Sequence, residues 1–114
     1  MIRLRVRLRA DGCLAGFEAT GHAAAGRRGR DLVCAAVTVL LRTAARLLSD
    51  CPELGAEGAS PAEGVMRLEL GCAPESRRQW LRGVTDMLLM GLRDLDREHP
   101  GRLKLEVGEE PDGT

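Results

Sequence analysis

The feature that most constrains this chain is a strict alternation of apolar and charged residues near its start. Four apolar residues alternate there with four arginines: Ile2, Arg3, Leu4, Arg5, Val6, Arg7, Leu8 and Arg9. Because successive side chains of a strand point to opposite faces, this period of two predicts a half-buried strand. Asp11-Gly12 is a turn signal, and the pattern of residues 14–20 predicts the returning strand of a β-hairpin.

Two longer stretches carry apolar residues at helical spacing. The first begins at Asp31 and ends before Pro52 and Gly55, and the second is opened by Pro74 and stopped by His99. His99 itself is expected to be a helix-end residue. Each stretch therefore predicts an amphipathic helix that covers a sheet.

Residues 65–70 and 103–107 alternate and predict two further strands, whereas residues 55–64 are small and polar and predict an exposed connection. The resulting order is β-β-α-β-α-β. It predicts a single two-layer α+β domain over residues 1–108, with a mixed or mostly antiparallel sheet and two helices. Residues 109–114 are expected to form an acidic C-terminal tail that frays.

Composition narrows the function classes. The 17 basic and 17 acidic side chains give zero formal charge, and one Trp and one Phe leave little aromatic surface for stacking on bases. No uninterrupted apolar run reaches 18 residues, and the N-terminus does not form a signal-peptide block. We therefore expect a cytoplasmic protein without a membrane partner, in a reducing compartment.

None of the four cysteines belongs to a Cys-x-x-Cys pair. This spacing argues against a structural metal site, and the expected compartment argues against disulfides, so we expect no metal and no cofactor. Cys13, Cys51 and Cys72 have neither a nearby histidine nor a clear helix start, and they are expected to be packing or surface residues. Cys34 is different.

Asp31 is a good N-cap for the first helix, which places Cys34 at its third position. The first-turn N–H groups of a helix have no intrahelical partner and carry partial positive charge. Both effects stabilise a thiolate and lower the pKa of a thiol. The same N–H groups, those of Val33 and Cys34, are candidate donors to the oxyanion of an acyl-transfer intermediate.

His22 lies twelve residues before Cys34, and an imidazole can accept the thiol proton and return it to a leaving amine. The intervening segment is expected to be a mobile loop because of its three glycines: Gly21, Gly26 and Gly29. Taken separately, Cys34 is also consistent with a core cysteine and His22 with an ordinary loop histidine. A phosphatase loop is excluded because position 40 is Leu where that chemistry needs Arg, and no P-loop signature occurs.

Two supporting residues have open roles. Asp31 either caps the helix or orients His22 as a third catalytic group. Thr38 lies four residues after Cys34 on the same helix face, where its hydroxyl either contacts the thiolate or packs.

Around these residues the chain resembles the bacterial ribosomal-processing cysteine proteases, the Prp family. The family pattern is Gly-His-Ala, a glycine-containing loop, and Gly-x-Asp-Ile-Val-Cys-Ala-[Ala/Gly]-Val-Ser. Here Gly21-His22-Ala23 is followed by Gly29-Arg30-Asp31-Leu32-Val33-Cys34-Ala35-Ala36-Val37-Thr38. Leu32 replaces Ile and Thr38 replaces Ser, and the substitution at Thr38 adds a methyl group beside the hydroxyl.

The resemblance implies a cytoplasmic thiol endopeptidase and homodimer in which His22 and Cys34 form the catalytic pair and the loop closes over substrate. It implies that the substrate is the precursor of large-subunit ribosomal protein number twenty-seven, from which the family removes an N-terminal extension during ribosome assembly. The alternative is a non-catalytic ribosome- or RNA-associated module. It would contact phosphates through the N-terminal arginines and through three arginines of the loop: Arg27, Arg28 and Arg30.

Overall fold

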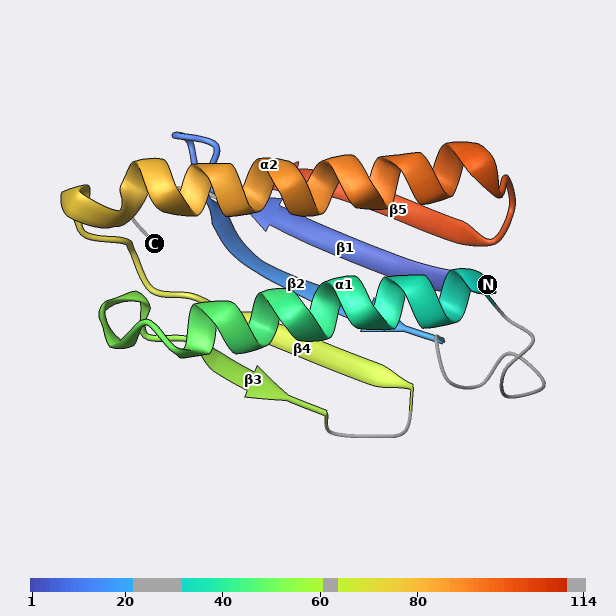
Figure 1. The fold of residues 1–114 in the computed structure, drawn as a ribbon, viewed down its shortest axis with the longest axis horizontal. Helices are drawn as coiled ribbons and strands as arrows, with labels where there is room; N and C mark the ends of the chain where they lie inside the picture. Colours follow the sequence, from blue (N-terminus) through green and yellow to red (C-terminus); the bar gives the residue numbers. More distant parts are fainter. Residues whose placement is uncertain (22–31, 61–63, 111–114) are drawn as a thin grey trace.

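The computed structural model describes residues 1–21, 32–60 and 64–110 (Figure 1). The elements along the chain are β1 (Ile2–Leu8), β2 (Leu14–Thr20), α1 (Leu32–Ser49), the 3-10 turn η1 (Pro52–Leu54), β3 (Glu57–Ala59), β4 (Val65–Glu69), α2 (Glu75–Glu98) and β5 (Leu103–Glu109). The predicted hairpin, both helices and the last two predicted strands are confirmed.

The five strands form one mixed sheet in the order β3-β4-β2-β1-β5. β1 pairs antiparallel with β2 and parallel with β5, whereas β2–β4 and β4–β3 are antiparallel pairs. β5 is reached from β4 through α2, which crosses over the sheet and returns the chain in the direction of β1, since strands that run in parallel cannot be joined by a short turn. The predicted mixed sheet is therefore confirmed.

Both helices lie side by side on one face of the sheet (Figure 1). From the N-terminal strand, Ile2, Leu4 and Val6 are buried beneath them, whereas the alternating arginines Arg3 and Arg5 are exposed on the other face. Burial of the apolar stripes of α1 and α2 against this sheet surface closes the core. The arrangement confirms a two-layer α+β domain with one sheet face open to solvent.

The structure departs from the predicted order at one element. Glu57–Ala59, inside the expected exposed connection, pairs with β4 as the short edge strand β3. A three-residue strand whose residues are all exposed has no periodicity for the sequence to reveal.

Two residues of the expected acidic tail, Glu109 and Glu110, have contacts with the sheet. β5 extends through Glu109, and Glu110 is bound by arginines of the sheet. Residues 111–114 lie outside the described part of the chain.

α1 is long and apolar enough, by length and composition alone, to span a membrane, with a mean hydropathy of 1.7. The core helix of a folded domain meets the same criterion. In this structure Val33, Val37, Leu41, Ala44 and Leu48 of α1 are buried in the domain core. Packing against the sheet therefore accounts for this buried stripe of α1, whereas Leu32, Val39 and Leu47 are exposed.

Candidate active site

Cys34 is the third residue of α1, as predicted, because the helix begins at Leu32. Its side chain is half-buried and packs against the core. Val33 beside it is buried, whereas Leu32 is 74% exposed. Cys34 thus belongs to the partly exposed first turn of α1, whose N–H groups have no partner within the helix.

Thr38 follows one turn later in α1 and is also half-buried. Residues four apart lie on the same helix face, so Thr38 is the neighbour of Cys34 along the helix. Thr38 therefore has the helical position predicted from the sequence, and the role of its hydroxyl stays a prediction.

Gly21 follows the last residue of β2 and has a left-handed backbone, with φ of +82°. Its N–H donates a hydrogen bond of 3.0 Å to the carbonyl of Gly64, just before β4. A Cβ at Gly21 would lie 2.7 Å from the carbonyl oxygen of Met1. The first of the three predicted loop glycines is therefore anchored to the sheet and sets the direction in which the chain leaves β2, immediately before His22.

His22, Gly26, Gly29 and Asp31 lie outside the described residues. The pairing of His22 with Cys34 and the role of Asp31 therefore remain predictions. The structure places Cys34 and Gly21, the residue directly before His22.

The other cysteines have different surroundings. Cys13 is buried, and its thiol contacts the carbonyl of Arg78 at 3.4 Å. Burial raises the pKa of the Cys13 thiol, and the nearby carboxylate of Asp11 raises it further. Cys51 is buried and Cys72 is exposed, so of the two alternatives left open by the sequence, the structure places Cys51 in the core and Cys72 on the surface.

Of the four cysteines, Cys34 is the one that lies within an α-helix. Within residues 1–21, 32–60 and 64–110, no three His, Cys, Asp or Glu side chains gather as a metal site.

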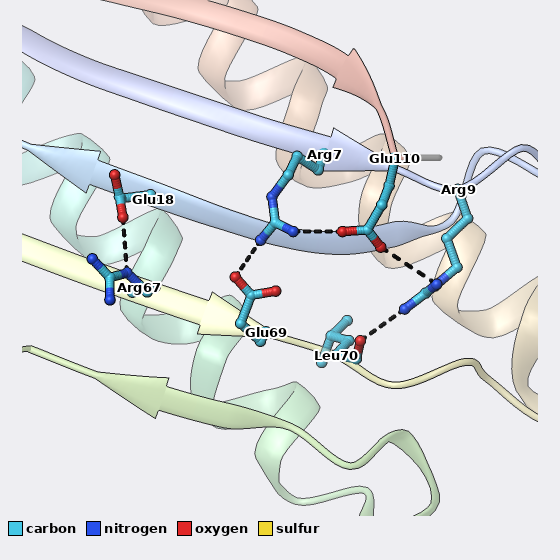
Figure 2. A network of polar contacts seen from close by, with 7 residues as sticks. All are labelled: Arg7, Arg9, Glu18, Arg67, Glu69, Leu70 and Glu110. Carbon is cyan, nitrogen blue, oxygen red and sulfur yellow. Dashed lines mark hydrogen bonds and ion pairs between the residues drawn. The ribbon is translucent and has the colours of Figure 1, made fainter. Parts of the chain in front are cut away.

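The N-terminal arginine stripe lies on the open face of the sheet and is largely paired with acids. Arg7 forms ion pairs with Glu69 and Glu110, and Arg9 reaches both Glu110 at 3.5 Å and the carbonyl of Leu70 at 2.8 Å (Figure 2). On the same face Arg67 pairs with Glu18 at 2.8 Å. The stripe belongs to a face of mixed charge, which does not favour the predicted alternative of a phosphate-binding surface.

A model of the cysteine protease Prp family matches residues 1–104, nearly the whole chain. The chain belongs to the Prp family of cysteine proteases. The predicted family is thereby confirmed, and with it the class of enzyme. No curated protein matches the chain.

Solved structures show the same fold. SMU.848 from Streptococcus mutans superposes with a TM-score of 0.78 at 24% identity, over 96% of each chain. The ribosomal processing protease Prp from Staphylococcus aureus, in complex with a covalently linked product peptide, has a TM-score of 0.75 at 17% identity, over 94% of this chain and 99% of the other. The same S. aureus protein with a substrate peptide has a TM-score of 0.75 at 16% identity, with the same coverage.

One further feature of the structure was not predicted from the sequence. An open groove of about 460 Å³ lies between α1 and the strands β3 and β4. Its signal in the sequence was weak, because the residues that leave it open, Gly58, Ala59 and Ser60, looked like an ordinary connection.

Proposed function

We propose that this Prp-family protease removes the N-terminal extension of large-subunit ribosomal protein number twenty-seven, in the cytoplasm, during ribosome assembly. The proposal is supported by family membership over residues 1–104 and by the fold shared with the ribosomal processing protease of S. aureus, which has been seen with substrate and product peptides. The observation that carries the chemistry is the place of Cys34 in the first turn of α1.

In the proposed mechanism, His22 accepts the proton of Cys34, and the thiolate attacks the scissile carbonyl. The tetrahedral oxyanion accepts hydrogen bonds from first-turn amides, for which Val33 and Cys34 are the candidates. Collapse breaks the peptide bond, and the imidazolium gives its proton to the leaving amine. Water, activated by the same imidazole, then hydrolyses the thioester and releases the extension as a carboxylate.

The supporting roles follow from position. α1 is 18 residues long, so its N-terminal dipole is fully developed at Cys34 and stabilises the thiolate. Asp31 immediately precedes the helix, where a side-chain cap would fix the first turn. Thr38 offers a hydroxyl one turn below the thiol.

We further propose that the protein acts as a homodimer through the outer face of its helices. Several large apolar side chains are exposed there, and an apolar groove of about 290 Å³ runs between α1 and α2. The exposed members are Val39, Leu47, Met87 and Met90. Contiguous apolar surface of this kind is typical of association sites, and a twofold contact would cover the same face on both copies.

Cleavage of a synthetic precursor peptide tests the protease function. The parent and Cys72→Ala, which changes an exposed cysteine, are expected to cleave it equally, whereas Cys34→Ala and His22→Ala lose about three orders of magnitude or more in kcat/KM. Far-ultraviolet circular dichroism checks that each variant is folded. A folded Cys34→Ala variant that cleaves as well as the parent would rule the proposal out.

Sedimentation equilibrium tests the dimer. Met87→Glu places a charge on the apolar face and is expected to shift the protein to monomer, whereas Arg93→Glu, an exposed change on α2, leaves the mass unchanged. A parent protein that stays monomeric at a concentration on the order of 50 micromolar would contradict this interface.

A further inference from the structure

A groove of about 460 Å³ lies between α1 and β3. One wall is the C-terminal half of α1, with Arg42, Arg46 and Ser49. The other wall is the edge of the sheet, with Gly58 and Met66. β3 is the edge strand of the sheet: one of its sides pairs with β4, and no strand of residues 1–21, 32–60 or 64–110 lies on its other side.

The charge of the groove is unbalanced. Arg42 and Arg46 are exposed and one helical turn apart, where like charges repel. Neither forms an ion pair with any acid in the described ranges, in contrast to the paired arginines of the sheet face. Asp50 is the acidic residue among the described lining residues, so a net positive charge faces the groove.

Gly58 leaves space in the groove, although the backbone conformation at this position does not require glycine. Its φ is not in the left-handed region, and a Cβ there would meet only ordinary contacts, at 3.8 Å from the carbonyl oxygen of Arg67 and 3.9 Å from Leu68. Gly58 pairs with Leu68, which is buried under the helices, so a side chain at position 58 would also point toward α1. The absence of a side chain at Gly58 therefore leaves open space within the groove.

The groove lies on the same side of α1 as Cys34. Ala45, which lines it, is eleven residues after Cys34, about three full turns of a helix. Arg42 and Arg46 are about 12 and 18 Å farther along the axis than Cys34, at 1.5 Å per residue. An extended peptide covers that distance in about four to six residues.

We propose that this groove binds an extended segment of the substrate that carries an acidic side chain four to six residues from the scissile bond. The inference rests on the proposed peptidase function of Cys34. Arg42 and Arg46 supply the charge that recognises the carboxylate, and the empty space at Gly58 admits the peptide backbone.

Charge-swap kinetics test the recognition. A series of cleavable peptides is prepared from one parent sequence. Each peptide carries Glu, Gln or Lys at a single position four to six residues from the scissile bond, on one side or the other. The parent is expected to prefer Glu to Lys by about fivefold or more in kcat/KM at one of these positions, and Arg42→Glu with Arg46→Glu to reverse the preference. Arg93→Glu, an exposed change on α2, should keep it. Equal rates for all peptides, or a preference that survives the double reversal, would overturn the proposal.

Gly58→Val separates the groove from the fold, because valine favours strands and a Cβ at position 58 meets only ordinary contacts. We expect its urea midpoint to equal or exceed that of the parent while the preference for Glu is lost. A stable Gly58→Val variant with the parent's preference would refute the role of the groove.

The same peptides, labelled with a fluorophore, are also bound to Cys34→Ala, and fluorescence anisotropy measures their affinity. This measurement distinguishes the groove hypothesis from the peptidase hypothesis. Tighter binding of the Glu peptide, with no cleavage by the parent, would retain the groove and reject the peptidase. Cleavage without any charge preference would reject the groove alone.

Discussion

The guanidinium group of Arg7 lies directly over Gly16, in the space that a Cβ at Gly16 would need. The two residues are cross-strand partners on β1 and β2. With no side chain at Gly16, Arg7 reaches across β2 and pairs with Glu69 on β4 and with Glu110 beyond β5 (Figure 2). One glycine thus lets a single arginine bridge the open face of the sheet.

Gly16→Ala is expected to destabilise the protein by about 1–3 kcal/mol, the usual cost of overpacking. The new methyl group would displace Arg7 and would also lie 2.6 Å from the carbonyl oxygen of Leu68, which cannot move without disturbing the sheet. Urea unfolding measures the effect. Gly108→Ala on β5 is the matched control, because no atom lies within 4 Å of its Cβ position; equal effects of the two changes would contradict this account.

The hydroxyl of Thr85 ties α2 to the hairpin. It is fully buried, accepts a hydrogen bond of 3.0 Å from the N–H of Leu14 and donates one of 2.7 Å to the carbonyl of Leu81. Thr85→Val keeps the shape but leaves the Leu14 N–H without this acceptor, so we expect a loss of about 1–3 kcal/mol in the free energy of unfolding. Thr85→Ser retains the hydroxyl and should lose less; thermal unfolding that ranks Ser below Val would refute the hydrogen-bond explanation.

Gly21→Ala is expected to lower both stability and peptidase activity. A left-handed conformation costs an alanine about 1–2 kcal/mol, and the Met1 carbonyl must also shift. Because His22 is the next residue, the displacement should reduce kcat more than a general loss of stability explains. The check is kcat measured well below the melting temperature of the variant, with Gly101→Ala as control, since Gly101 also has φ of +82° but open space around it. Equal kcat for the two variants would argue against a positioning role.

The raised pKa of Cys13 predicts a loss of stability in alkali. Burial, followed by the charge of Asp11, favours the neutral thiol in the folded state. The folded pKa is above the unfolded one, so this contribution is complete below about pH 8.5 and is lost as the pH rises through the folded value. Urea unfolding under reducing conditions should show a steeper decline between neutral and alkaline pH for the parent than for Cys13→Ala. Parallel declines would show that Cys13 does not titrate as inferred.

The elements that the sequence predicted are those with a clear period. The alternation from Ile2 to Leu8 and the two helical stripes each have one apolar face, and burial of that face fixes the element and the layer. β3 was missed because Glu57–Ala59 is held by pairing with β4 and not by its own pattern. Glu110 was assigned to a fraying tail because its partners, Arg7 and Arg9, are about a hundred positions away in sequence.

The candidate site likewise has a part that the sequence predicts and a part that it does not. The helical position of Cys34 follows from local spacing, and the structure has it. The anchor of Gly21 on Gly64, and the open groove at Gly58, depend on which strand lies beside which. Such contacts between distant segments have no local signature, so no reading of spacing alone could supply them.

The parallel pairing of β1 with β5 has a consequence for synthesis. β1 leaves the ribosome about a hundred residues before β5, its neighbour on one side. Until Glu109 has emerged, the nascent chain exposes one unpaired edge of β1, and the arginines near its end lack Glu110. Closure of the sheet therefore requires β5, and α1, which carries Cys34, is synthesised before the sheet that it covers is complete.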